Sequence, residues 1–493
     1  MLSLTRRLPF AKPRGGPYNA ENNPALVGLA HGAVRHRRLD DHAHGRRVTP
    51  VDVAASAPPN DDVSTTAPLA RARVGVGALV ALLVVTVAWG HWITTHSTRS
   101  VVLGALPFFG YWEPALTARL LLPMTVAVVL VAALPRVAQR WRWRTTLTAV
   151  GFGSVAFSVS LALVDPPGMR WRSITTDYGA FKGLVDQTGG PGGFLRTYVD
   201  RQLQLPTHLS AHPPGMPMLL WAANRVGVSG IGFESALALV GAAVAAIAAL
   251  VALRDVAGDS VARRAAPFVV VAPAAIWHTN ADALFAGVAV GAVALVVVAT
   301  GRTGRRAATL GAAGGVLFGL ALLLSYGLAL MAIPIVAVAS WRRAPVALAA
   351  AGVATIAVLA VPALWGFSWL AGLQATRIAY ASSLADARPY WFFLVADLAV
   401  LAAALGPAVL VGLTRLREGP VLVLVGAGLA VVAFADVTGL SSAETERIWQ
   451  PFMPLLLVAG YAAARGPRWT TTRWLALQAT GAIALQAFLR SPW

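Results

Sequence analysis

The chain has 493 residues, of which 57% are hydrophobic and 12% charged, and its mean hydropathy is +0.65. Soluble globular proteins carry roughly 25% charged residues, so this composition excludes that class and indicates an integral membrane protein with many spans. The absence of cysteine excludes disulfides and thiolate chemistry. The net charge is +19, and in a membrane protein such an excess of basic residues usually lies in the cytoplasmic loops. We therefore expect no nucleic-acid partner.

Residues 1–73 differ in character from the rest of the chain. They contain eleven basic and six acidic residues, many proline and glycine residues and no long apolar run. This pattern predicts a disordered basic tail in the cytoplasm. The tail is either merely solvated or bound to anionic lipid headgroups. Residues 74–493 are predicted to form the transmembrane domain.

Apolar runs follow one another along this domain, and a span needs about 20 mostly apolar residues. The predicted spans lie near 74–95, 117–134, 145–164, 233–253, 265–279, 282–299, 308–324, 326–340, 345–366, 390–413, 420–438, 450–464 and 472–489. Every second connecting loop is rich in arginine, and these loops together hold seventeen basic residues and three acids. The positive-inside rule then predicts a cytoplasmic N-terminus, and we expect the protein in the plasma membrane with its active site on the outer face. The expected fold is an all-α polytopic bundle of about thirteen spans.

The longest predicted outer loop, 165–232, has internal order. Apolar residues at helical spacing predict two amphipathic helices at the membrane interface. The first places Tyr178, Phe181, Leu184 and Val185 on one face, and the second Phe194, Leu195, Tyr198, Val199 and Leu203. A glycine-rich breaker at 189–193 separates them. The Pro213-Pro214 pair is expected to start a further helix through Trp221.

The outer loops also hold the candidate functional residues, because most acids beyond the tail fall on this side and acids close to a bilayer tend to be functional. Asp177 either caps a helix that starts near Tyr178 or acts as a general base. His212 is either a helix-start residue or a group near a phosphate or metal. Glu446 and Arg447 are either an interfacial ion pair or part of a phosphate site.

A second group of candidates lies in other outer loops. Arg377, Tyr380 and Arg388 suit phosphate and sugar contacts, although snorkelling toward headgroups explains the arginines equally well. Glu113 is a candidate second acid beside an aromatic belt. Asp282 is predicted to be the N-cap of a span.

Three short motifs carry a family resemblance: Asp177-Tyr178 at the start of the loop, His212-Pro213-Pro214-Gly215, and Glu446-Arg447 before a late span. Over about residues 145–465 the chain resembles the C-type superfamily of membrane glycosyltransferases, which includes protein O-mannosyltransferases, the lipid A aminoarabinose transferase and actinobacterial envelope mannosyl- and arabinosyltransferases. The chain departs from the pattern in two ways. The usual second acid is Tyr178, and two spans precede the loop instead of one.

The resemblance implies sugar transfer from a polyprenyl-phosphate donor to a glycan, lipid or protein acceptor on the outer face. Asp177 would be the general base and inversion the expected outcome. His212 would assist catalysis, while Tyr178, Glu446, Arg447, Arg377, Tyr380 and Arg388 would contact substrate. No cofactor is required by the sequence, and a divalent metal remains open. The alternatives are a flippase or transporter of lipid-linked sugars, an envelope glycan ligase or polymerase, and a non-catalytic scaffold.

Overall fold

The computed structural model describes residues 66–97, 101, 103–167, 171, 173–382 and 388–492. Helices dominate these ranges, so the predicted all-α membrane bundle is confirmed. Within the same ranges the only strands are β1 (Tyr111–Trp112) and β2 (Leu489–Arg490), which pair antiparallel and tie the C-terminal end to the loop after α1. The expected basic tail lies outside the described residues as far as residue 65.

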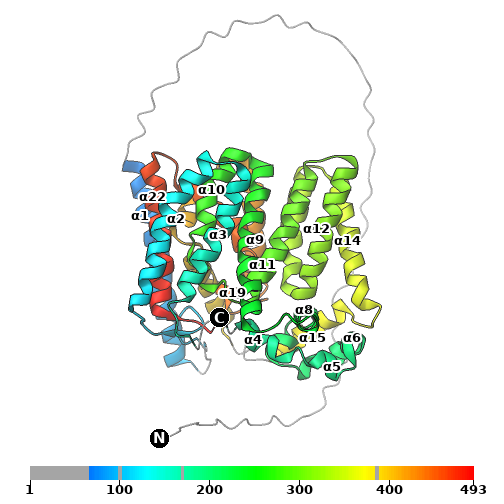
Figure 1. The fold of residues 1–493 in the computed structure, drawn as a ribbon. Helices are drawn as coiled ribbons and strands as arrows, with labels where there is room; N and C mark the ends of the chain where they lie inside the picture. Colours follow the sequence, from blue (N-terminus) through cyan, green and yellow to red (C-terminus); the bar gives the residue numbers. More distant parts are fainter. Residues whose placement is uncertain are drawn as a thin grey trace, which may run out of the picture. The chain divides into compact units, whose positions relative to one another are not determined.

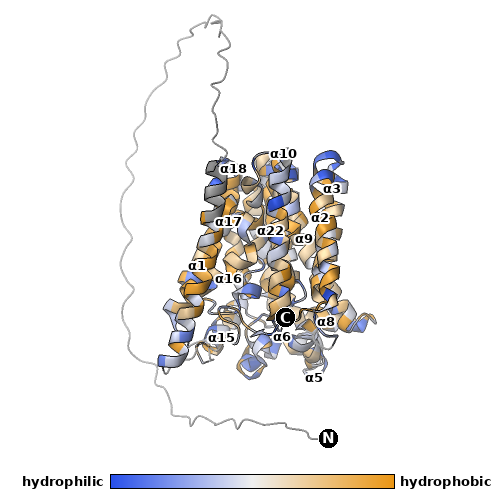
Figure 2. Ribbon diagram, turned by 90° about the vertical axis from the view of Figure 1, so that its left-hand side faces the viewer, coloured by the Kyte–Doolittle hydropathy of each residue, from blue (hydrophilic) through white to orange (hydrophobic). Residues whose placement is uncertain are grey.

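Eight helices in the described part of the chain are long and apolar enough to cross a membrane. They are α1 (Thr66–His96), α2 (Leu121–Arg140), α3 (Trp143–Ala162), α9 (Ile231–Ala257), α11 (Ala281–Thr300), α12 (Gly304–Leu324), α14 (Pro345–Ala363) and α18 (Gly419–Val437). The apolar part of α1 begins at Val74, where the first span was predicted. Figure 2 shows apolar residues along the middle of the helices and hydrophilic residues toward their ends.

Four of the other predicted spans are shorter or interrupted, and the fifth, α22 (Arg468–Phe488), is long but not apolar enough to pass the same test. The four correspond to α10 (Asp259–Val270) with η4 (Pro273–Trp277), η5 (Tyr326–Met331) with α13 (Ala332–Trp341), α16 (Tyr390–Leu405) with α17 (Pro407–Arg415), and α20 (Met453–Leu457) with α21 (Gly460–Ala463). A twelve-residue helix such as α10 is about 18 Å long, whereas the hydrocarbon core is about 30 Å thick.

The count of thirteen spans is therefore not confirmed, since eight helices pass this test, or nine if the bent pair α16–α17 is one span. The two halves of that pair meet at 99°. Gly406 at the bend has φ +77°, and Pro407 starts a new helix. Apolar composition predicts that a segment is buried, but it does not show where proline and glycine interrupt the helix.

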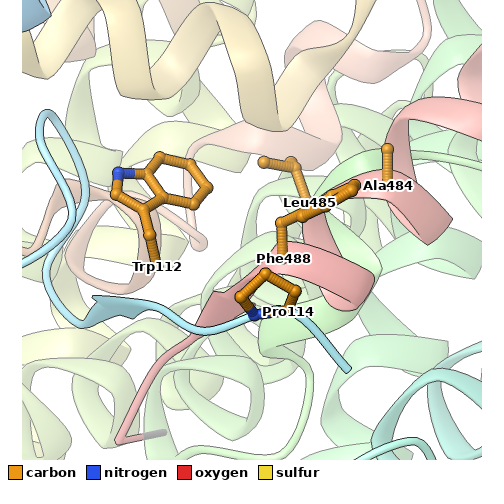
Figure 3. A pocket seen from close by; sticks show the side chains of 5 residues that line it. All are labelled: Trp112, Pro114, Ala484, Leu485 and Phe488. Atoms are coloured by element: carbon orange, nitrogen blue, oxygen red, sulfur yellow. The ribbon is translucent and has the colours of Figure 1, made fainter. Parts of the chain in front are cut away.

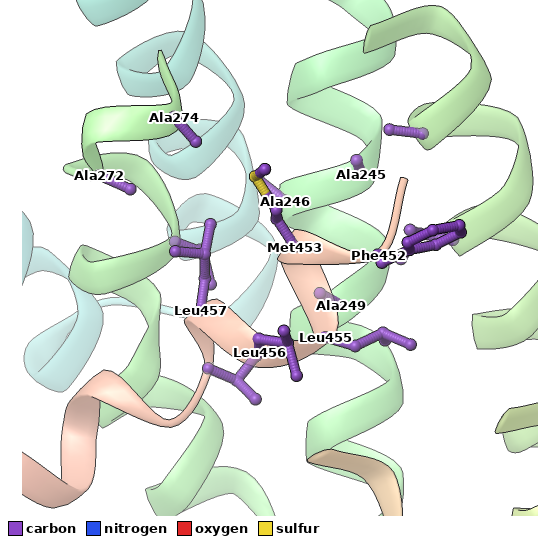
Figure 4. Close-up of a cluster of buried hydrophobic side chains, with 14 of the residues drawn as sticks. Ala245, Ala246, Ala249, Ala272, Ala274, Phe452, Met453, Leu455, Leu456 and Leu457 are labelled. Atoms are coloured by element: carbon purple, nitrogen blue, oxygen red, sulfur yellow. The ribbon is translucent and has the colours of Figure 1, made fainter. Parts of the chain in front are cut away.

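The centre of the bundle is built from small residues that let helices approach closely. A Cβ on Gly287 of α11 would lie 2.6 Å from the carbonyl oxygen of Gly241 of α9. Alanines of α9 also face Met453 and the leucines of α20 in a buried apolar cluster (Figure 4). This close packing lies near the start of α11, where Asp282 and Phe285 of the candidate site stand.

The long loop and two later segments form short helices that gather at one end of the bundle, where the chain's C-terminal end also lies (Figure 1). They are α4 (Ser173–Asp177), η2 (Gly179–Phe181), α5 (Leu184–Gln187), α6 (Gly190–Arg201), η3 (Gln202–Gln204), α7 (Thr207–Ser210), α8 (Gly215–Arg225), α15 (Trp369–Ala381) and α19 (Thr445–Ile448). The remaining short element is η1 (Ala118–Leu120), which leads into α2. We call the end of the bundle where these short helices gather the loop end.

The loop follows the predicted pattern in part. The second amphipathic helix is α6, which buries Phe194, Leu195 and Tyr198, and the helix through Trp221 is α8. The first predicted helix is wrong, because the chain forms three short pieces there, α4, η2 and α5. The glycine-rich stretch is also not wholly a breaker. Only Gly189 precedes α6, and the remaining glycines form its first turn.

Gly215 is the residue that lets the His212-Pro213-Pro214-Gly215 turn dock on the bundle. A Cβ at this position would lie 2.1 Å from the carbonyl oxygen of Leu323, near the end of α12. The same turn also contacts the next residue of α12, because the Nδ1 atom of His212 lies 3.3 Å from the carbonyl oxygen of Leu324. The glycine thus has a packing role next to the candidate site.

We expect Gly215→Ala to destabilise the protein by about 1–3 kcal/mol, since it overpacks a backbone contact. Thermal unfolding in detergent, followed by fluorescence, measures the change. Gly232→Ala in the first turn of α9 is the matched control, because no atom lies within 4 Å of a Cβ built there. Equal unfolding temperatures for the two variants would contradict the packing role.

Candidate functional site

Asp177 is the last residue of α4, and its carboxylate has a partner on each oxygen. Oδ2 accepts a hydrogen bond from Ser173 Oγ at 3.1 Å, and Oδ1 lies 3.3 Å from Nε2 of His208. The side chain is 19% exposed. The capping alternative is wrong, because α4 ends at Asp177 and no side chain caps η2, which follows.

The surroundings of Asp177 make its carboxylate a stronger base than usual. Burial raises its pKa to about 6, while the hydrogen bond from Ser173 and the charge of Arg447 oppose the rise. At neutral pH the group is therefore largely ionised, yet it accepts a proton more readily than an ordinary aspartate. A partly exposed carboxylate with this pKa suits a general base.

Tyr178 follows Asp177 in the chain, and its ring lies close to both histidines of the loop. Its side chain is 2% exposed, burial raises its pKa, and its ring centroid lies 5.9 Å from those of both His208 and His212. The ring of Phe285 from α11 packs against Tyr178 and His212. This aromatic group forms the floor of the site.

Both histidines are neutral at pH 7. Burial lowers the pKa of His208 to about 3 and that of His212 to about 4, and the positive charge of Arg447 adds to each shift. Tyr198 of α6 fixes the turn that carries them, because its hydroxyl donates to the carbonyl oxygens of Leu209 (2.7 Å) and His212 (2.9 Å). The amphipathic helix α6 thereby positions the histidines.

Arg447 of α19 is the cation of the site. Its Nη1 lies 3.0 Å from Oδ2 of Asp282, in the first turn of α11, and its Nη2 lies 2.7 Å from Oε2 of Glu444. Burial lowers its pKa, but the two carboxylates outweigh this and hold the pKa above the usual range, so the guanidinium stays charged. The charges of Arg447, Asp282 and Glu444 all act on Asp177, which places the four residues in one cluster.

The turn that leads into α19 has a strained backbone. Ala443 and Glu444 have φ values of 73° and 61°, in the left-handed region that non-glycine residues rarely adopt. The buried carboxylate of Asp397 in α16 holds this turn, because its Oδ1 accepts from the backbone N–H of Ala443 (3.2 Å) and the hydroxyl of Thr445 (3.3 Å). Strain of this kind often marks functional sites.

Glu446 was predicted to contact substrate, and the structure places it inside the protein. The residue is fully buried, and its Oε1 accepts from the backbone N–H of Phe109 at 3.1 Å. Burial raises the pKa of Glu446 to about 7. Its contact anchors the loop after α1 to α19, next to Arg447.

Two of the three remaining predicted site residues, Arg377 and Tyr380, lie on α15, and Arg388 lies just before α16. Arg388 donates from Nη1 to the carbonyl oxygen of Ser442, in the strained turn. Tyr380 is half-buried. Burial raises the pKa of its hydroxyl, and the interactions with Ser442 and Arg388 oppose this rise without cancelling it. Arg377 is exposed on α15 and is not part of the cluster around Arg447.

Three residues of the cluster were not predicted from the sequence. His208 stands four positions before His212, and this pair of histidines in one loop was the available signal. Asp282 was expected to cap α11, but Asn280 caps it by accepting from the N–H of Ala283, and Asp282 pairs with Arg447 instead. No sequence pattern singled out Glu444 as a site residue, apart from its position two residues before Glu446.

No group of three or more histidine or acidic side chains in the described ranges is arranged to hold a metal ion. A cavity of about 430 Å³ lies between Trp112, Pro114 and the last turns of α22 (Figure 3). Its lining contains no ionisable side chain. Comparison with known proteins gives no matching family model and no matching curated protein.

Proposed function

We propose that the protein transfers a sugar from a polyprenyl-phosphate donor to an acceptor hydroxyl at the loop end of the bundle. The observation that carries this proposal is Asp177, a partly exposed carboxylate with a pKa of about 6 in the same cluster as the arginine Arg447. A base and a fixed cation at the end of a membrane bundle suit a lipid-linked donor, whose tail stays in the bilayer while its sugar phosphate reaches the surface.

The proposed reaction uses Asp177 as the proton acceptor. The acceptor oxygen loses its proton to the carboxylate and bonds to the anomeric carbon. The bond from that carbon to the phosphate oxygen breaks, and polyprenyl phosphate departs with the bonding electrons. A single base and a single displacement give inversion at the anomeric carbon.

Arg447 is proposed to bind the donor phosphate, and its present partners suggest how. The side chain of Asp282 is 8% exposed, whereas that of Glu444 is 21% exposed. The backbone of Glu444 is also in the left-handed conformation. In this proposal the phosphate takes the place of Glu444, and Asp282 keeps Arg447 in position. Tyr178, Glu446, Arg388 and Tyr380 support the site, and the exposed Arg377 is open to headgroups or substrate.

The proposed topology puts the loop end outside the plasma membrane and the N-terminus in the cytoplasm. The five remaining segments, α22 among them, would each complete one further crossing, which brings the proposed count to thirteen. The arginine-rich connections would then all lie on the cytoplasmic side.

Single cysteines introduced into this cysteine-free chain test the orientation. Gln187 and Arg305 are both exposed, and they lie in the long loop and in the first turn of α12. We expect Gln187→Cys to react with an impermeant thiol reagent in intact cells, and Arg305→Cys only after the membrane is opened. The reverse pattern would invert the topology and remove the site from the outer face.

A flippase of lipid-linked sugars is the second candidate, and the interrupted helices favour it. Discontinuous spans are typical of transporters, and this chain has a 99° bend between α16 and α17 as well as a buried acid, Asp397, within α16. A flippase moves the donor without cleaving it. Release of polyprenyl phosphate therefore separates the two functions.

Membranes incubated with radiolabelled polyprenyl-phosphate mannose or arabinose test the proposal. We expect label from one of these donors to appear in a glycan, lipid or protein product only when the protein is present. A polymerase or ligase would instead transfer a preassembled glycan. Absence of any product from either donor, with the protein folded, would count against the proposed sugar transfer.

A further inference from the structure

The pair formed by Asp177 and His208 has a geometry that the proposed base does not by itself require. Nε2 of His208 lies 3.3 Å from Oδ1 of Asp177, while the hydroxyl of Ser173 donates a hydrogen bond to Oδ2. The imidazole is 24% exposed and the carboxylate 19%, so the contact lies at the edge of the solvent-accessible site. Catalytic hydrogen bonds are often long before substrate binds and tighten afterwards.

We infer that His208 is a positioning residue that holds the Asp177 carboxylate ionised and correctly oriented by donating its Nε2 proton to Oδ1. The inference rests on the proposed function for its catalytic meaning. Because His208 is neutral at pH 7, the tautomer with its proton on Nε2 is a donor and not a competing base. The remaining lone pairs of the carboxylate stay available for the proton of the acceptor.

Other charged and titratable groups face the pair, and none of them replaces His208. They are Tyr178 beside the ring of His208, His212 before α8, Asp282 in α11, and Glu444 and Arg447 at α19. Arg447 favours the ionised carboxylate, but its two acidic partners oppose that effect. Apart from Ser173, His208 is therefore the residue that the described part of the chain places against the carboxylate, with Nε2 at 3.3 Å from Oδ1.

Removing a donor from a carboxylate raises the pKa of the acid. We expect His208→Leu to raise the pKa of Asp177 by about one unit or more, which is the size of a hydrogen bond to a charged group. His208→Gln keeps an N–H donor without a titratable ring, so the pKa of Asp177 in this variant should lie close to that of wild type. The acidic limb of the transfer rate should move with the carboxyl titration in both variants.

Infrared difference spectroscopy measures the titration directly and without any substrate. The C=O stretch of protonated Asp177 is assigned by its loss in Asp177→Asn, and its midpoint is then compared between wild type and the His208 variants. His278→Gln is the matched control, because His278 is a half-buried histidine whose ring contacts Ser158 instead. That variant should leave the midpoint in place.

An unchanged or lower midpoint in His208→Leu would overturn the inference, even if that variant were less stable. The same holds if His208→Gln shifts the midpoint as far as His208→Leu does. The proposed function fails in a different way, namely when wild-type protein releases no polyprenyl phosphate from its donor. The carboxyl titration still tests the role of His208 in that case.

Discussion

Replacing Asp177 with asparagine is expected to lower sugar transfer by about 100- to 10,000-fold, which is the usual loss when a general base is removed. Asparagine keeps the shape of the side chain and still accepts the hydrogen bond from Ser173, but it cannot take up a proton. For the same reason, wild-type transfer should fall as the pH drops through about 6, where the carboxyl becomes protonated. Initial rates with a labelled donor across this pH range measure both effects.

Donor binding and folding provide the controls for Asp177→Asn. The carboxylate is not proposed to hold the phosphate, so the affinity for the donor should change little. Thermal unfolding should also stay close to that of wild type. Transfer within a few-fold of wild type in Asp177→Asn would falsify the assignment, and Glu113 would be the next carboxylate to test.

Replacing Arg447 is expected to have two separable effects. Arg447→Ala leaves the buried carboxylate of Asp282 without a cation, and breaking a buried pair in this way costs about 3–5 kcal/mol of stability. Arg447→Lys keeps the charge but loses the planar fork that binds a phosphate through two parallel bonds. We expect Arg447→Lys to remain folded and to bind the donor about tenfold more weakly or worse.

A double variant separates the structural role of Arg447 from the binding role. Adding Asp282→Asn to Arg447→Ala removes the unpaired buried charge, so stability should return toward that of wild type. Donor binding should stay weak, because no cation has been restored. Normal donor affinity in this folded double variant would exclude Arg447 from the phosphate site.

The membrane character was predictable because it depends on local composition. Each of the eight long helices coincides with a predicted apolar run, and α6 follows from the spacing of Phe194, Leu195 and Tyr198. The shorter elements were not predictable in the same way. The segment around α10 breaks between Val270 and Pro273, and the bend at Gly406 depends on a left-handed residue between two apolar stretches.

The candidate site could be predicted only residue by residue. Asp177, His212 and Arg447 stood out because polar residues beside apolar spans are few. Their partners could not be identified, since Asp282 and Arg447 are 165 positions apart and meet only when α11 and α19 pack together. The same holds for the strained turn at Ala443 and Glu444, whose backbone depends on a hydrogen bond to Asp397 in another helix.

The most direct test of sugar transfer is to follow one donor through one preparation. Purified wild-type protein and Asp177→Asn are reconstituted in vesicles with a polyprenyl-phosphate sugar labelled in the sugar, together with envelope acceptors. Product and free polyprenyl phosphate are then measured together. We predict that wild type forms both in equal amounts and that Asp177→Asn forms neither at a comparable rate. Movement of intact donor across the bilayer by both proteins, without release of polyprenyl phosphate, would contradict this prediction and identify a flippase.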